Sequence, residues 1–215
     1  MNTTRFFQSI SVVLHPIFIP CIIAGVFLFG AHEAPWLDIK ARWSLFSLIG
    51  TITTLLPISC LLLMQRFGVV QSPHLHQRDE RSFALSIMIL ALAIACYILL
   101  NKINVSTNLN IAFVTMTLTL IVATIVNFLD KISLHCIGLA GFIGICIYFI
   151  TSNINAPIIL FDALGLSIIF LGVIMTARLQ LKAHTNYQVY LGTIIGLLCG
   201  YFGAIGSALL IGGGQ

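Results

Sequence analysis

The sequence predicts an all-α bundle of membrane-spanning helices, and three observations support this fold class. Hydrophobic residues make up 59% of the 215 residues and charged residues only 7%, far below the roughly 25% charged residues of soluble domains. Several apolar runs reach the roughly 20 residues that a helix needs to cross the hydrocarbon core. These runs are continuous, whereas the strands of a transmembrane barrel alternate apolar and polar residues. We therefore expect one integral membrane domain over residues 1–215, with six to seven spans.

The first three spans are expected at about residues 10–30, 43–64 and 83–100. His15, Pro16 and Pro20 interrupt the first run. Because proline lacks the N–H that the helix ladder needs, we expect this span to be kinked. The longest polar segment of the chain, Gln65 to Ser82, separates the second span from the third.

The last four spans are expected at about residues 110–128, 132–150, 157–175 and 189–211. Pro157 suits the first turn of its helix. Glycines recur at helical spacing in two of these spans, namely Gly138, Gly141, Gly144, Gly192, Gly196 and Gly200. Small residues at such spacing let two helix backbones approach closely. We expect each set to lie on one helix face and to pack within the chain.

Three polar connections of this topology fall on the same side of the membrane as the N-terminus: 65–82, 129–131 and 176–188. Four of the six histidines lie in or next to them: His74, His76, His135 and His184. Seven of the ten Lys and Arg residues are on that side as well. Four of those seven are candidates for chemistry, so the positive-inside rule does not decide the orientation.

The connection before the last span carries Arg178, Lys182 and His184 within seven residues, and Lys131 and His135 form a second basic group. The guanidinium of arginine binds phosphate oxygens through two parallel hydrogen bonds. A neutral imidazole can attack phosphorus, and a second, protonated imidazole can give a proton to the leaving oxygen. Two histidines and several cations at a membrane surface therefore indicate phosphoryl transfer from a lipid.

The spacing Arg178-x5-His184-x3-Gln188 resembles the third signature, S-R-x5-H-x3-D, of the type 2 phosphatidic acid phosphatase superfamily. Ser133 and His135 resemble its second signature, P-S-G-H. The segment 77–82 occupies the place of the first signature, K-x6-R-P. The phrases around these residues are also similar to a divergent branch of the superfamily in Bacteroidetes-type bacteria, and the resemblance covers about residues 65–205.

This resemblance implies a lipid-phosphate or lipid-pyrophosphate phosphatase of a bacterial cytoplasmic membrane that needs no metal or other cofactor. It implies His184 as nucleophile and His135 as general acid. The side chains expected to bind phosphate are Arg178, Arg81, Ser133, Arg78 and Lys131. The substrate would be a phosphorylated membrane lipid, and nothing in the sequence predicts binding of nucleic acid or sets an oligomeric state.

Gln188 stands where the superfamily has an aspartate. A carboxylate orients the imidazole and stabilises its positive form, whereas an amide supplies orientation without charge. Asp79, Glu80 and Asp130 are the carboxylates on the same side that could replace it. Two readings therefore stay open: an enzyme, or a catalytically silent protein that binds anionic lipid head groups.

Two further alternatives rest on single features. Asp162 falls inside the sixth predicted span, and intramembrane carboxylates occur in transporters. His74 and His76 have a spacing found in metal sites. We rank both below the first two readings, because no inverted repeat accompanies Asp162 and a lone H-x-H pattern is weak.

Overall fold

The computed structural model describes residues 3–31, 35–68, 78–103 and 105–212; for residues 3 and 78–81 it describes the backbone alone. Within this part of the chain, seven segments are helical, long and apolar enough to cross a membrane. They are Thr4–Gly30, Ile39–Arg66, Ser82–Ile103, Thr107–Leu129, Leu134–Ser152, Ile158–Gln180 and Asn186–Gly212. The prediction of an all-α polytopic bundle is confirmed.

The first span is broken near its middle, as its prolines predict. Helix α1 (Thr3–Val13) ends before an extended His15 with φ −68° and ψ 135°. A short 3-10 turn, Pro16–Phe18, then leads into α2 (Ile19–Gly25). Pro16 lacks the N–H that would continue the helix, and the break lies at this point. As a result, His15 lies outside any regular helix.

The remaining helices are α3 (Ile39–Gly50), α4 (Leu56–Arg66), α5 (Arg78–Ile98), α6 (Thr107–Leu129), α7 (Leu134–Ser152), α8 (Ile158–Gln180) and α9 (Asn186–Gly212). A π turn at Thr51–Leu55 joins α3 to α4, just before Pro57. Side chains start two of the helices: Asp38 Oδ1 accepts the N–H of Ala41 at α3, and Ser106 Oγ accepts an N–H at α6.

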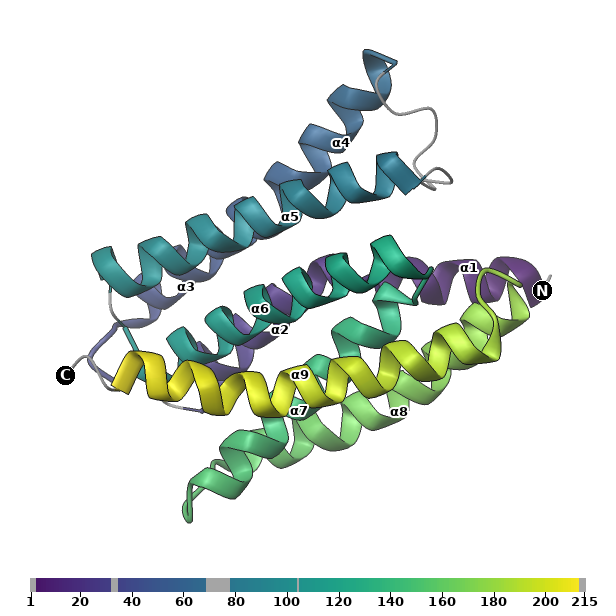
Figure 1. Cartoon of the computed structure of the whole chain (residues 1–215). Coiled ribbons are helices and arrows are strands. Elements are labelled where there is room, and N and C mark those ends of the chain that lie inside the picture. Colours follow the sequence, from purple (N-terminus) through teal and green to yellow (C-terminus); the bar gives the residue numbers. More distant parts are fainter. Residues whose placement is uncertain (1–2, 32–34, 69–77, 104, 213–215) are drawn as a thin grey trace.

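Helix α7 lies at the centre of the bundle, packed between α8 and α9, while α6 packs on the other side of α9 (Figure 1). The α4 and α5 pair forms the outer edge of the molecule (Figure 1). Helices α1, α5, α7 and α9 begin at one end of the bundle, and α4, α6 and α8 finish there. We call this the site end. The described ends of the three connections that were predicted on one side of the membrane lie here.

Glycines bring α7 and α9 into backbone contact. A methyl group at Gly196 would lie 2.5 Å from the carbonyl oxygen of Ile137, and one at Gly192 would lie 3.0 Å from that of Ser133. A Cβ at Gly200 would collide with the backbone of Gly141. The glycine row of the last span therefore packs within the chain, as expected.

The expectation that the three glycines of α7 share one face is wrong. Gly144 faces α9, where a Cβ would lie 2.5 Å from the Leu197 carbonyl, whereas Gly138 faces the first span and meets Pro16 Cβ at 3.0 Å. A step of three residues turns a helix face by about 60°, so positions 138 and 144 diverge. One helix thus accepts two close neighbours on different faces.

The glycine contact predicts an asymmetry between two substitutions in α9. Gly196→Ala forces the helices apart, so we expect the thermal midpoint of the purified protein to fall by roughly 5 °C, the shift for about 2 kcal/mol of overpacking. Gly206→Ala is the matched control, because a Cβ there meets nothing within 4 Å. It should leave the midpoint unchanged or raise it, since alanine favours helix. Equal midpoints for the two variants would contradict the packing described.

Candidate functional site

The turn between α8 and α9 is fixed by the way α8 ends. The N–H of Ala183 donates to the carbonyl of Arg178 at 3.1 Å, and the N–H of Lys182 donates to that of Leu179 at 2.9 Å. This pair of bonds is the Schellman motif. Lys182 has φ 50°, so it occupies the left-handed position at which glycine is usual. The end of α8 thereby sets the path of the chain towards His184.

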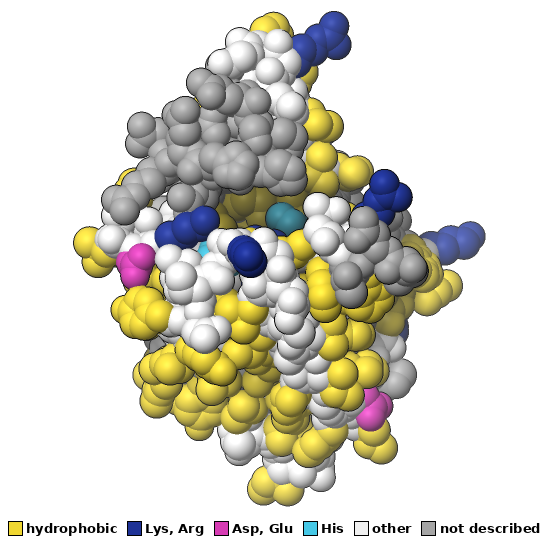
Figure 2. Space-filling view, turned by 90° about the vertical axis from the view of Figure 1, so that its right-hand side faces the viewer, with side chains coloured by type: hydrophobic (Ala, Val, Ile, Leu, Met, Phe, Trp, Pro, Cys, Tyr) yellow, Lys and Arg dark blue, Asp and Glu magenta, His cyan; other side chains and the backbone are white. Residues whose placement is uncertain are grey.

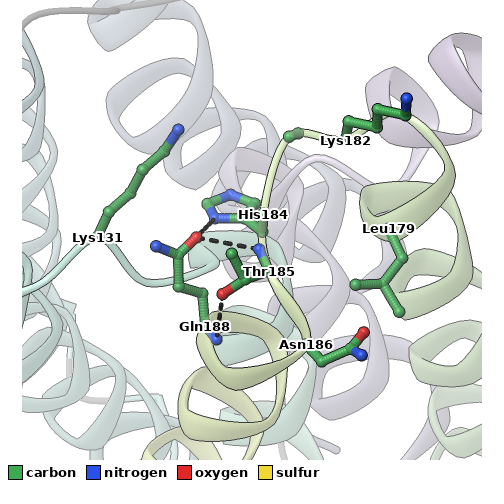
Figure 3. Close-up of a pocket in the computed structure, with 8 residues that line it drawn as sticks. Lys131, Leu179, Lys182, His184, Thr185, Asn186 and Gln188 are labelled. Carbon is green, nitrogen blue, oxygen red and sulfur yellow. Dashed lines mark hydrogen bonds between the residues drawn. The ribbon is translucent and has the colours of Figure 1, made fainter.

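A capping box starts α9. The N–H of Gln188 donates to Thr185 Oγ1 at 3.3 Å, and Gln188 Oε1 accepts the N–H of Thr185 at 3.2 Å (Figure 3). The two residues thus satisfy each other's unpaired N–H groups at the helix start. This box was not predicted from the sequence. Its signal was present in Thr185-x-x-Gln188 before an apolar run.

The capping box also determines which ring nitrogen of His184 carries the hydrogen. Gln188 Oε1 lies 3.2 Å from His184 Nδ1 (Figure 3). A backbone N–H can only donate, so the Gln188 atom that faces Thr185 must be the oxygen, and His184 Nδ1 must carry the hydrogen. In the neutral ring, Nε2 then holds the lone pair. Figure 3 shows Nε2 on the ring edge that points away from Gln188.

Ser133 joins the start of α7 to the start of α9. Its backbone N–H donates to the carbonyl of Gln188 at 3.4 Å. Ser133 occupies the N-cap of α7, but its hydroxyl caps no N–H. The side chain is 0% exposed, and its Oγ makes no hydrogen bond of standard geometry, although the Cys136 thiol lies beside it. An unsatisfied buried hydroxyl costs stability and requires an explanation.

His135 extends from the first turn of α7 towards the first span. Its Nε2 lies 3.0 Å from the carbonyl oxygen of Ser11. A carbonyl can only accept, so Nε2 carries the hydrogen and Nδ1 is left to gain or lose a proton. The His15 ring lies edge-to-face with the His135 ring, with centroids 5.1 Å apart and an interplanar angle of 82°.

Arg178, in the last turn of α8, acts electrostatically on both His135 and His15. His184 also acts on His135. The Nε of Arg178 is buried without a hydrogen-bond partner. No carboxylate of the described residues acts on Arg178, so within this part of the chain nothing compensates the guanidinium charge. A half-buried cation of this kind favours an anion beside it.

His184 also lines an open pocket of about 600 Å³. Its lining residues are Lys131, Leu179, Lys182, Ala183, His184, Thr185, Asn186 and Gln188. Both lysines are exposed and stand on opposite sides of His184 (Figure 3). Figure 2, which looks onto the site end, shows Lys and Arg side chains around a hollow that contains a His side chain. His184 therefore lines a solvent-open basic pocket and also acts electrostatically on His135, which Arg178 influences as well. We call Arg178, His135 and the residues that contact the His135 ring the inner group.

The structure brings five of the residues predicted from the sequence into this region: Ser133, His135, Arg178, His184 and Gln188. Lys131 lines the pocket beside them. The side chains of Arg78, Asp79, Glu80 and Arg81 lie outside the described residues, and so do His74 and His76. In the part of the chain that is described, no three His, Cys, Asp or Glu side chains gather as they would around a metal ion.

Asp130, the one candidate substitute for the family aspartate whose side chain is described, makes a different contact, and Asp162 of the transporter alternative lies elsewhere. Asp130 Oδ1 accepts the backbone N–H of Lys131 at 2.7 Å, so this carboxylate caps its own turn. Asp162 is exposed on the second turn of α8, at the opposite end of that helix from Arg178. The group that meets His184 Nδ1 is the amide of Gln188.

Two members of the inner group that contact the His135 ring, Ser11 and His15, were not predicted as site residues from the sequence. An ionisable residue inside an apolar run is a signal of function, and His15 precedes a proline that breaks the helix. Neither feature indicates which helix packs against His15. Their approach to His135 depends on how the first span packs against α7.

Comparison with protein-family models, with curated proteins and with solved structures finds no match. The seven apolar helices among the described residues define the class: this is a polytopic α-helical integral membrane protein.

The left-handed conformation of Lys182 predicts how substitutions there behave. A non-glycine residue in this conformation costs about 1–2 kcal/mol, so Lys182→Gly should leave the thermal midpoint unchanged or raise it by a few degrees. We expect the same variant to bind inorganic phosphate less tightly, because a cation beside the pocket is lost. Lys182→Arg keeps the charge and the strain, and serves as the control for binding. A lower midpoint for Lys182→Gly would show that the lysine side chain itself stabilises the turn.

Proposed function

We propose that this protein is a membrane-embedded lipid-phosphate or lipid-pyrophosphate phosphatase that acts through a phosphohistidine at His184. The observation that carries the proposal is the pair of unsatisfied donors beside the histidines, Arg178 Nε and Ser133 Oγ. Arg178 Nε is a buried donor without an acceptor, and Ser133 Oγ has only the weakly bonding Cys136 thiol beside it. A phosphoryl group supplies several acceptor oxygens with negative charge. The resemblance of Arg178-x5-His184 to a phosphatase signature supports the same reading.

The tautomer of His184 suits a nucleophile. Its Nδ1–H is held by Gln188 Oε1, and the lone pair on Nε2 attacks phosphorus. The new P–N bond forms as the P–O bond to the lipid alcohol or lipid phosphate breaks. Charge on the phosphoryl oxygens is stabilised by Arg178, as positioned cations do in phosphoryl transfer.

His135 supplies the proton for the leaving oxygen. Its Nε2–H is bonded to the Ser11 carbonyl, so the proton that moves must be one added at Nδ1. The partly buried ring beside Arg178 is neutral without a ligand, and the negative charge of a bound phosphoryl group favours its protonation. The leaving oxygen takes that proton, and His135 becomes neutral. Water then attacks the phosphoimidazole, the P–N bond breaks, inorganic phosphate forms, and His135 recovers a proton from the attacking water.

The membrane supplies the substrate in this proposal. The site end lies where several spanning helices begin or finish (Figure 1), so a lipid can keep its tails in the bilayer and present its head group to Arg178. Lys131 and Lys182, at the pocket beside His184, would draw anionic head groups towards the site.

The second candidate is a silent protein that binds anionic lipid head groups with the same cations. One observation favours it: the capping box accounts for Gln188 through helix stability alone. A glutamine retained for capping would lack the charge that stabilises an imidazolium. The two candidates differ in whether phosphate is released.

We expect purified protein to release phosphate from at least one member of a panel of lipid phosphates and lipid diphosphates, and we expect Gln188→Glu to raise its turnover about tenfold, or roughly 1.4 kcal/mol in the barrier. Glutamate has the length of glutamine, so it keeps the capping box and adds the missing charge. Gln188→Asp adds the charge on a side chain one methylene shorter and should gain less. The glutamate variant should also shift the pH optimum upwards, because a carboxylate raises the pKa of its imidazole partner.

His184→Ala is the control and should abolish release while keeping the thermal midpoint of the wild type. A chelator should leave release intact, because the phosphoryl charge is met by organic cations. Unchanged release by His184→Ala would exclude the phosphohistidine route. No release by the wild type, Gln188→Glu or Gln188→Asp, together with measurable binding of lipid phosphate, would establish the silent reading.

A further inference from the structure

The break in the first span brings the imidazole of His15 next to that of His135, near Arg178. It is the third imidazole of this region, after His135 and His184. We propose that His15 is a ligand of the phosphoryl anion, donating its Nε2–H to an oxygen of the group that Arg178 holds. This inference rests on the proposed function only for the chemical class of the ligand, a phosphoryl anion. It assigns to His15 a binding role that the resemblance to the phosphatase signatures does not include.

The hydrogen-bond pattern fixes which nitrogen of His15 is the donor. Its Nδ1 accepts the backbone N–H of Ile17 at 3.2 Å. A nitrogen that accepts has no hydrogen, so the neutral ring carries its hydrogen on Nε2. His15 is exposed as a residue, so the bundle does not enclose it on all sides.

The position of His15 places that donor beside the other groups. Its ring is 5.1 Å from the His135 ring, centroid to centroid. Arg178 acts electrostatically on both rings. Arg178 Nε and Ser133 Oγ, both buried, lack hydrogen-bond partners. One phosphoryl group with three terminal oxygens offers acceptors for donors from the first span, α7 and α8 together.

The fold holds His15 at this place through two contacts of the turn that follows it. Pro16 packs against Gly138 of α7, where an added Cβ would lie 3.0 Å from the Pro16 Cβ. The hydroxyl of Thr54 donates to the carbonyl of Ile17 at 3.1 Å, inside the bundle. The second span and α7 therefore both fix the 3-10 turn that carries His15.

The neutral state of His15 lets it bind an anion by hydrogen bonding alone. An imidazole with Nδ1 committed to a backbone N–H donates one hydrogen bond without adding a second positive charge next to Arg178. It therefore contributes geometry to anion binding while Arg178 contributes charge. His135 remains available to exchange its Nδ1 proton, so the two histidines of the pair perform different tasks.

Two amide variants separate the nitrogens of His15. In His15→Asn, the side-chain oxygen can accept the Ile17 N–H as an N-cap residue does, but no group reaches the position of Nε2. In His15→Gln, the longer amide can donate near the position of Nε2 while the cap is lost. The measurement is the Kd for inorganic phosphate, by ³¹P NMR of the full-length protein in detergent micelles, with the thermal midpoint of each variant.

We expect His15→Asn to raise the Kd for inorganic phosphate at least tenfold with an unchanged midpoint. His15→Gln should keep the Kd within about threefold and lower the midpoint by a few degrees, as the loss of a cap does. Wild-type affinity in His15→Asn, or equal losses in both variants, would overturn the role of Nε2. If phosphate binds as expected but no lipid phosphate is hydrolysed, the proposed enzyme fails while His15 stands as a ligand.

Discussion

The close contact between α7 and α9 is the constraint on which the rest of the site depends. Both helices begin at the site end, and the glycines of α9 lie against the backbone of α7 from Ser133 to Gly144. At this separation the backbone of Ser133 bonds directly to that of Gln188. Side chains that are about fifty residues apart in sequence thereby come to lie at one place.

Two hydrogen-bonded motifs at helix ends set the path of the chain between α8 and α9. The Schellman motif ends α8 and the capping box starts α9, so the chain from Arg178 to Gln188 has a defined path. His184 lies between these two motifs, and its Nδ1 bonds to the same Gln188 oxygen that caps the helix. Gln188 therefore has two roles, a structural one and an orienting one. An amide at this position fulfils both roles without adding a charge.

Much of this arrangement could be predicted from the sequence. Hydropathy located the spans, because each apolar run is long enough to cross the membrane by itself. The spacing of Arg178 and His184 indicated that the turn between α8 and α9 belongs to the site, and this turn lines the pocket. The loops that carry Lys131 and His184 were assigned to one side of the membrane, and the site end contains both (Figure 1).

The sequence could not supply contacts that depend on tertiary packing. Ser11 and His15 meet His135 because the first span breaks and Pro16 fits against Gly138, and no local pattern specifies that partner. The face assigned to Gly138 was wrong for a related reason: three-residue spacing turns steadily around the helix. The capping box of Thr185 and Gln188 is different, since its sequence pattern was present and went unused.

The central claim is that this packing builds a nucleophilic imidazole at His184. The most direct measurement is to mix the protein with a lipid phosphate labelled on its phosphoryl group, quench during turnover, and map the label by peptide mass spectrometry. The account predicts an acid-labile, alkali-stable phosphoimidazole on His184 and none in His184→Ala. Turnover without label on the protein, or label on another residue, would contradict it.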